Sequence, residues 1–131
     1  MIGLDTNVLV RFLVRDDEDQ YERACDLIRT EAQREAVLCV SLLVLLETEW
    51  VLRSRYKLGK EDILGIFSEL LSAGDMRFED EPAIAQALFM WKDSSAQFAD
   101  CLIGARHWAL GCTATATFDQ GALKLSSFVA A

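Results

Sequence analysis

The sequence predicts an α/β fold in which a mostly parallel β-sheet carries helices on both faces. Short apolar runs of strand length alternate along the chain with segments whose apolar residues recur at helical spacing, as in βαβ units. Residues 36–40 form one such run, apolar throughout and followed by Ser41, which is typical of a strand covered on both faces. Ligands of such sheets bind outside the carboxyl ends of the strands, so functional side chains are expected there.

The first elements follow from where apolar sequence starts and stops. An apolar run at residues 1–4 predicts a strand that ends at Asp5 and leads into a short helix over residues 8–14. Residues 16–19 are charged and predict a solvated turn. A single apolar stripe then predicts a helix over residues 20–33.

Two longer helices are expected after the strand at residues 36–40. The first runs over residues 41–57, with Ser41 as a candidate N-cap and Gly59 marking its end. The second runs over residues 61–72 and stops at Gly74.

The remaining sequence repeats the alternation of strand and helix. Residues 76–79 alternate weakly and predict a third strand, and a proline in the first turn opens a helix over residues 82–91. A helix over residues 98–110 follows a short loop and is closed by a glycine. Residues 112–118 alternate threonine with small or apolar side chains, as a strand does.

Length and composition indicate one globular domain. The chain has 131 residues, of which 52% are hydrophobic and 26% charged, so we expect a single domain over residues 1–131. The longest apolar run, residues 42–46, is far shorter than the roughly 18 residues of a membrane span, and the N-terminus has no signal-peptide pattern. A cytoplasmic protein with no membrane partner is therefore expected.

Cysteine, histidine and charge limit the chemistry. Four cysteines without C-x-x-C spacing and a single histidine argue against a zinc site and against a disulfide framework. A net charge of −8 gives no general attraction to nucleic acid. Nucleic-acid binding would therefore need local basic patches or bound cations.

Four carboxylates stand where each interrupts or abuts apolar sequence. Asp5 and Asp119 follow the first and last predicted strands, and the predicted helices that contain Glu47 and Asp100 start at the same edge of a parallel sheet. Four carboxylates in one cleft repel one another, and a hard divalent cation such as Mg²⁺ or Mn²⁺ is the usual relief. Such an ion activates water and neutralises phosphate oxygens, which predicts phosphoryl chemistry.

Each of these polar residues also has a purely structural interpretation. Asp5 is a candidate N-cap, and Asn7 could be a turn former. Asp100 could complement a helix dipole, and Asp119 before Gln120 could belong to an ordinary turn.

Glu47 competes with Glu49 for the position of the second acid. Glu49 lies four residues before Arg53, the favourable order for an exposed helical ion pair, so a surface role explains it. Glu47 has no such partner, and we therefore favour Glu47.

Four short motifs resemble those of PIN-domain ribonucleases, in the same order, and in particular those of VapC-like toxins of bacterial toxin–antitoxin pairs. They are D-T-N-V-L at residues 5–9, E-T-E-W-V-L at 47–52, F-A-D-C-L-I at 98–103 and T-F-D at 117–119. The resemblance covers essentially the whole chain.

This resemblance implies a three-layer α/β/α sandwich with a four- or five-stranded, mostly parallel sheet. It implies Mg²⁺- or Mn²⁺-dependent endonucleolytic cleavage of RNA by a homodimer that a cognate antitoxin holds inactive. Carried over by position, Asp5, Glu47, Asp100 and Asp119 are the metal-site acids, with Asn7 and Thr117 as supporting polar groups. Residues 125–131 depart from the family pattern because they are small and plain, which leaves a fifth strand open.

Basic residues near these motifs are candidate RNA contacts. Their alternative role is structural, because cations are favoured near helix C-termini and charged faces are often only solvated. The acidic surface could also attract a basic segment of the antitoxin. The candidate RNA contacts are Arg11, Arg15, Arg53, Arg55, Lys57 and Lys60.

Three other functions are compatible with parts of this pattern. A haloacid-dehalogenase-like phosphatase needs an acid where Asn7 stands, and an amide cannot shuttle the proton. A receiver-like signalling domain needs adjacent acids after the first strand and a lysine where Asp119 stands. A catalytically inactive PIN scaffold that binds RNA or protein partners keeps the fold, but the presence of all four acids argues against it.

Overall fold

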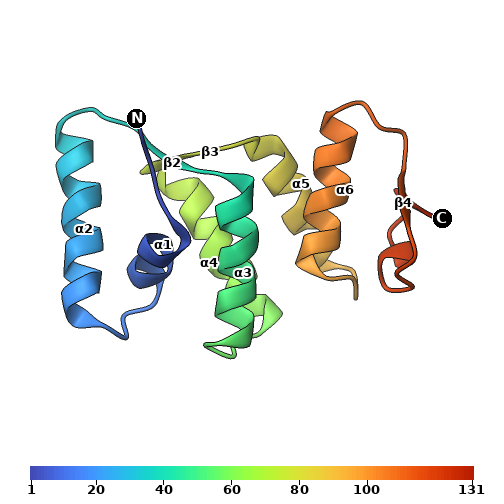
Figure 1. Ribbon diagram of the computed structural model, residues 1–131, viewed down its shortest axis with the longest axis horizontal. Coiled ribbons are helices and arrows are strands. Elements are labelled where there is room, and N and C mark those ends of the chain that lie inside the picture. Colours follow the sequence, from blue (N-terminus) through green and yellow to red (C-terminus); the bar gives the residue numbers. More distant parts are fainter. The chain divides into compact units, whose positions relative to one another are not determined.

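Six α-helices and five short strands alternate along the chain, and every paired strand runs parallel to its neighbour. The computed structural model describes residues 1–131 and divides them into two compact units, Met1–Glu79 and Asp80–Ala131 (Figure 1). The predicted α/β class with parallel strands is confirmed. None of the helices has both the length and the apolar composition needed to cross a bilayer.

The first unit is built on a three-stranded sheet in the order β1-β2-β3. Ile2 of β1 stands opposite Leu38 of β2, and Leu38 stands opposite Met76 of β3. Helix α1 packs on both α2 and α3, and α4 packs on α3 and β3. The elements are β1 (Ile2–Gly3), α1 (Thr6–Leu13), α2 (Glu18–Gln33), β2 (Leu38–Val40), α3 (Leu42–Ser54), α4 (Lys60–Ala73) and β3 (Met76–Phe78).

Side-chain caps determine where α2 and α3 begin. Ser41 caps α3 as predicted, since its hydroxyl accepts a hydrogen bond from the backbone N–H of Val44 at 3.2 Å. Asp17 caps α2 in the same way, which starts the helix at Glu18, inside the segment predicted as a turn. Each cap satisfies a backbone donor that has no partner within its helix.

Two of the predicted helix ends have different outcomes. Gly74 ends α4 in the left-handed conformation, with φ 76°, as a C-terminal glycine does. Gly59 is not the end of α3, because that helix stops at Ser54 and Gly59 is instead the N-cap of α4. The predicted helix over residues 41–57 is therefore too long, and Lys57 lies outside it with φ 57°.

The second unit contains a helix pair and a two-stranded parallel sheet. Helices α5 and α6 pack side by side (Figure 1), and Thr115 of β4 stands opposite Phe128 of β5. The C-terminal segment thus forms a fifth strand, which its plain sequence left open. The five strands make a three-stranded and a two-stranded sheet, however, and not the single four- or five-stranded sheet that the resemblance implies. The elements are α5 (Glu81–Lys92), α6 (Phe98–Ala109), β4 (Thr115–Thr117), a 3₁₀ turn (Ala122–Lys124) and β5 (Phe128–Ala130).

A glycine in α6 makes room for the fifth strand. A Cβ atom at Gly104 would lie 2.8 Å from the Phe128 ring, closer than packed atoms approach. Phe128 is buried, so its ring packs directly on the backbone of α6. Tertiary packing therefore stabilises β5, a strand of only three residues.

Candidate functional site

Asp5 lies at the junction between β1 and α1, where it is exposed. Its Oδ1 accepts a hydrogen bond from the backbone N–H of Thr6 at 2.8 Å, so the residue is the N-cap of α1. The cap uses one carboxylate oxygen. Oδ2 has no hydrogen-bond partner in the structure and remains available to a cation.

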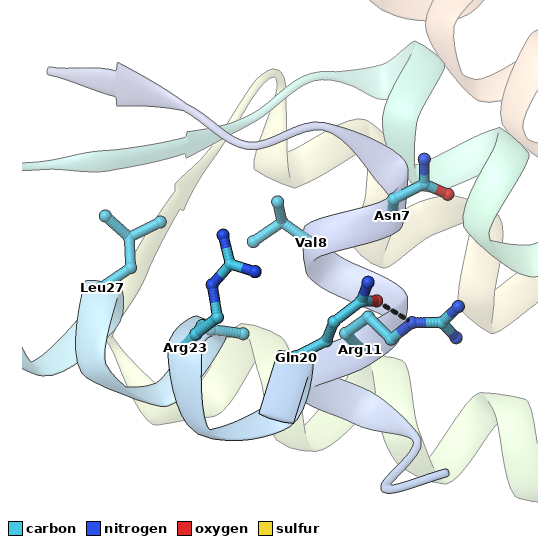
Figure 2. A pocket seen from close by; sticks show the side chains of 7 residues that line it. Asn7, Val8, Arg11, Gln20, Arg23 and Leu27 are labelled. Carbon is cyan, nitrogen blue, oxygen red and sulfur yellow. Dashed lines mark hydrogen bonds between the residues drawn. The ribbon is translucent and has the colours of Figure 1, made fainter. Parts of the chain in front are cut away.

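Asn7 lies in the first turn of α1, so the alternative interpretation of this residue as a turn former is wrong. It is exposed and lines a groove between α1 and α2 (Figure 2).

The two glutamates of α3 differ in environment. Glu47 is exposed and makes no hydrogen bond or ion pair. Glu49 pairs with Arg53 at 3.0 Å as predicted, but its side chain is only 4% exposed, so the expectation of a surface pair is wrong. The two residues are about 160° apart around the helix, and Glu49 lies on the buried face of α3.

Asp100 lies in the first turn of α6 and is half-buried. Burial raises the pKa of its carboxyl above the ordinary value, and the negative charge of Asp119 raises this pKa further. A hydrogen bond from the backbone N–H of Gln97, the N-cap of α6, acts in the opposite direction. Asp100 thus supports the helix terminus, as its structural interpretation predicts, and also lies within electrostatic reach of Asp119.

Asp119 follows β4 and is held by its neighbours in sequence. Its Oδ1 accepts a hydrogen bond from the backbone N–H of Gly121 at 2.9 Å, and its own N–H donates to Thr117 Oγ1 at 3.0 Å. The alternative interpretation of Asp119 as a turn residue is therefore also correct. As at Asp5, the second carboxylate oxygen has no hydrogen-bond partner.

The four predicted acids fall into two pairs, one in each unit. Asp5 caps α1 and Glu47 lies in α3, two helices that pack on each other, and Asp100 and Asp119 interact electrostatically. Neither unit by itself gathers three metal-binding side chains. The second pair nevertheless suits Mg²⁺, which one or two carboxylates hold while water and substrate phosphates complete its shell.

Three of the predicted RNA contacts form ion pairs within the chain. Arg15 pairs with Glu18 at 2.6 Å and lies over the Tyr21 ring, and Arg53 is the partner of Glu49. Arg55 and Lys57 are exposed, and Lys60 is half-buried.

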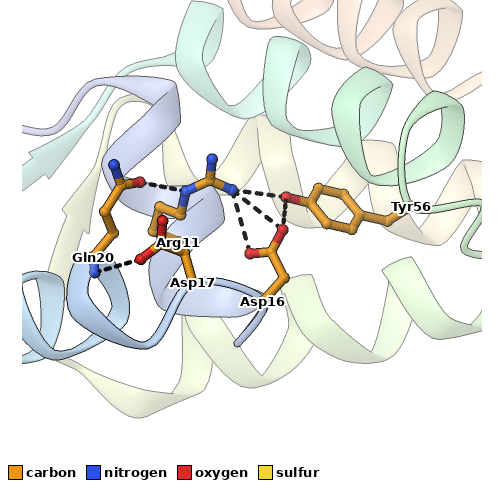
Figure 3. Close-up of polar contacts among 5 residues, drawn as sticks. All are labelled: Arg11, Asp16, Asp17, Gln20 and Tyr56. Carbon is orange, nitrogen blue, oxygen red and sulfur yellow. Dashed lines mark hydrogen bonds and ion pairs between the residues drawn. The ribbon is translucent and has the colours of Figure 1, made fainter.

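The third paired cation, Arg11, is the centre of a hydrogen-bond network (Figure 3). Its Nη1 donates to the Tyr56 hydroxyl at 2.8 Å and lies 3.3 Å from Asp16, and its Nε donates to Gln20. The Tyr56 hydroxyl in turn donates to Asp16 at 2.8 Å. The network joins α1 to the loops that follow α1 and α3, so Arg11 has a structural role and its charge is partly neutralised.

The groove between α1 and α2 is lined by a basic residue, Arg23, that the sequence analysis did not single out. The groove encloses about 350 Å³, and Arg23 of α2 lines it together with Asn7 and Arg11 (Figure 2). Arg23 lies four residues after Asp19, the spacing of an ordinary surface pair. Only the packing of α1 against α2 distinguishes it from the other exposed arginines.

Comparison with known proteins agrees with the motif pattern. The PIN domain family matches residues 2–126. The chain is also similar to a VapC ribonuclease of Aquifex aeolicus (strain VF5), with 27% identity over 122 residues, which covers 93% of this chain and 90% of the relative. This protein belongs to the PIN domain family.

Proposed function

We propose that this protein is a Mg²⁺- or Mn²⁺-dependent endoribonuclease and the toxin of a type II toxin–antitoxin pair. The observation that carries the proposal is the proximity of Asp100 and Asp119 in a PIN-domain chain. Burial and the negative charge of Asp119 disfavour the charged form of Asp100, and a bound cation would compensate both effects.

Each acid has a proposed role in holding the metal. Asp100 and Asp119 would hold it together with Asp5 and Glu47. Asp5 and Asp119 each use Oδ1 to accept a backbone hydrogen bond, which leaves Oδ2 for the metal. When bound, the metal supplies an activated water and neutralises charge on the phosphate oxygens. Thr117 supports this arrangement by accepting the Asp119 N–H, and Asn7 offers an amide two residues beyond Asp5.

The proposed partners are an RNA strand, a second copy of the chain and a cognate antitoxin. The similarity to a VapC ribonuclease supports the RNA strand and the antitoxin, and the second copy is what the resemblance of the motifs implies. Arg55 and Lys57 are exposed cations that can contact RNA phosphates, whereas Arg11, Arg15 and Arg53 share their charge with acids. Exposed apolar side chains such as Leu43 and Phe89 suit contacts with protein partners.

The test is cleavage of a mixed RNA pool by the full chain, purified free of antitoxin, with Mg²⁺, with Mn²⁺ and with EDTA. Asp5→Asn removes a metal-binding charge but keeps an N-cap, because asparagine caps helices about as well as aspartate. Asp17→Asn is the matched control, since it makes the same change at the N-cap of α2. We expect metal-dependent cleavage by wild type and Asp17→Asn, and the EDTA background from Asp5→Asn.

Equal cleavage by the two variants would contradict the role of Asp5. Wild type that neither cleaves any RNA nor binds Mn²⁺ in calorimetry would refute the enzyme. An inactive PIN scaffold, in which the acids serve only as caps and turn residues, would then explain the chain.

A further inference from the structure

We propose that the groove between α1 and α2 binds one nucleotide of the RNA strand next to the scissile bond, with Arg23 holding its phosphate. The inference rests on the proposed ribonuclease function. It adds a substrate subsite to the four acids and assigns a role to a residue that no motif contains.

The size and lining of the groove suit a nucleotide. Its volume of about 350 Å³ lies at the lower end of the range of small-ligand sites, about 300–1,000 Å³. Val8, Ala24 and Leu27 line it with apolar surface that can cover a sugar or a base. Arg23 provides the cation that a phosphate requires, and Arg11, although paired with Asp16, adds to the positive lining.

The charge of the groove lining is opposite in sign to the net charge of the chain. No carboxylate lines it, although the chain carries a net charge of −8. The charge of Arg11 is shared with Asp16. Arg23 lies 3.7 Å from Asp19, with both side chains at least 75% exposed, so that ion pair is weak and the guanidinium can exchange it for a phosphate.

The orientation of Arg23 brings its charge to the groove. Figure 2 shows its side chain rising from α2 toward Val8 of α1, across the space between the two helices. A guanidinium in this position can donate two hydrogen bonds to one phosphate.

The groove is also adjacent to a proposed metal-site acid. Asn7 lines it and lies two residues from Asp5 along α1. The groove therefore begins close in sequence to this acid, at the first turn of α1. A helical protein partner needs a longer groove with anchors over several turns, so RNA is the favoured occupant.

Arg23→Gln tests the proposal, and Arg29→Gln is its matched control. Both arginines lie on α2 and both form exposed ion pairs with a preceding aspartate, but Arg29 lines a different pocket beside Glu22 and Asp26. The measurement is steady-state cleavage of a single-stranded oligoribonucleotide with Mn²⁺ over a series of salt concentrations. Thermal unfolding of each variant checks that the fold is intact.

We expect Arg23→Gln to raise KM about three- to tenfold with little change in kcat. The slope of log kcat/KM against log salt should become shallower by about 0.7, the value for one phosphate contact on a single strand. Arg29→Gln should match wild type, and Arg23→Lys should recover the salt slope because it keeps the charge.

The outcomes separate this inference from the proposed function. Wild type that does not cleave RNA overturns both. Cleaving wild type with Arg23→Gln and Arg29→Gln indistinguishable overturns the nucleotide subsite alone, as it would if the groove received a protein partner. A selective rise in KM and a shallower salt slope for Arg23→Gln support the subsite.

Discussion

Asp100 is the residue at which stability and the proposed activity oppose each other. Burial and the charge of Asp119 hold the pKa of its carboxyl above the unfolded value. The folded chain therefore binds this proton more tightly than the unfolded chain. Ionisation costs stability, and this loss develops as the pH rises from the unfolded pKa through the raised folded pKa.

We expect Asp100→Asn to raise the Tm of the metal-free protein at neutral pH and to have little effect well below the unfolded pKa. The amide cannot ionise, but its oxygen can still accept the Gln97 N–H. Thermal unfolding in EDTA across pH measures the effect. Asp75→Asn, at an exposed loop position, serves as the control. A Tm difference that does not change with pH would show that Asp100 is not electrostatically strained.

The packing of β5 on α6 tests how much one contact between elements contributes. Gly104→Ala places a methyl group 2.8 Å from the Phe128 ring, and we expect a loss of about 1–3 kcal/mol in the free energy of unfolding. Gly65→Ala in α4 is the control, because nothing lies within 4 Å of its Cβ position. That variant should gain about 0.5–1 kcal/mol from helix propensity. Urea denaturation measures the free energy of unfolding of both variants, and a stabilised Gly104→Ala would contradict the close packing of Phe128 on α6.

The ion pair of Glu49 and Arg53 shows how burial changes the value of a helical pair. Glu49 is almost fully buried, so Arg53→Ala leaves its carboxylate without its partner and should cost about 1–3 kcal/mol in the free energy of unfolding. Arg29→Ala breaks an exposed pair of similar spacing and should change stability by less than about 1 kcal/mol. Equal losses in urea denaturation would contradict the difference in burial.

Across the whole molecule, one family match spans both compact units. Cooperative unfolding can test whether the two units form the single domain that the chain length predicts. We expect one cooperative thermal transition, with calorimetric and van't Hoff enthalpies in agreement and coincident curves from circular dichroism and tryptophan fluorescence. Two separate transitions would show that Met1–Glu79 and Asp80–Ala131 fold independently.

Local signals account for what could be predicted from the sequence. The α/β alternation, the Ser41 cap and the Gly74 helix end each depend on residues close together in the chain, and the structure confirms all three. The motifs around Asp5 and Asp119 indicated the PIN domain family, to which the chain belongs. Such features are readable because a cap or a period involves only a few neighbouring residues.

By itself, the sequence determined the fold class, the family and which acids to examine. The tertiary structure decided which of them interact, because residues far apart in the chain set burial and distance. It brought Asp100 within electrostatic reach of Asp119, buried Glu49 and formed β5. It also placed Arg23 at a groove without carboxylates, since only the packing of α1 on α2 creates that groove.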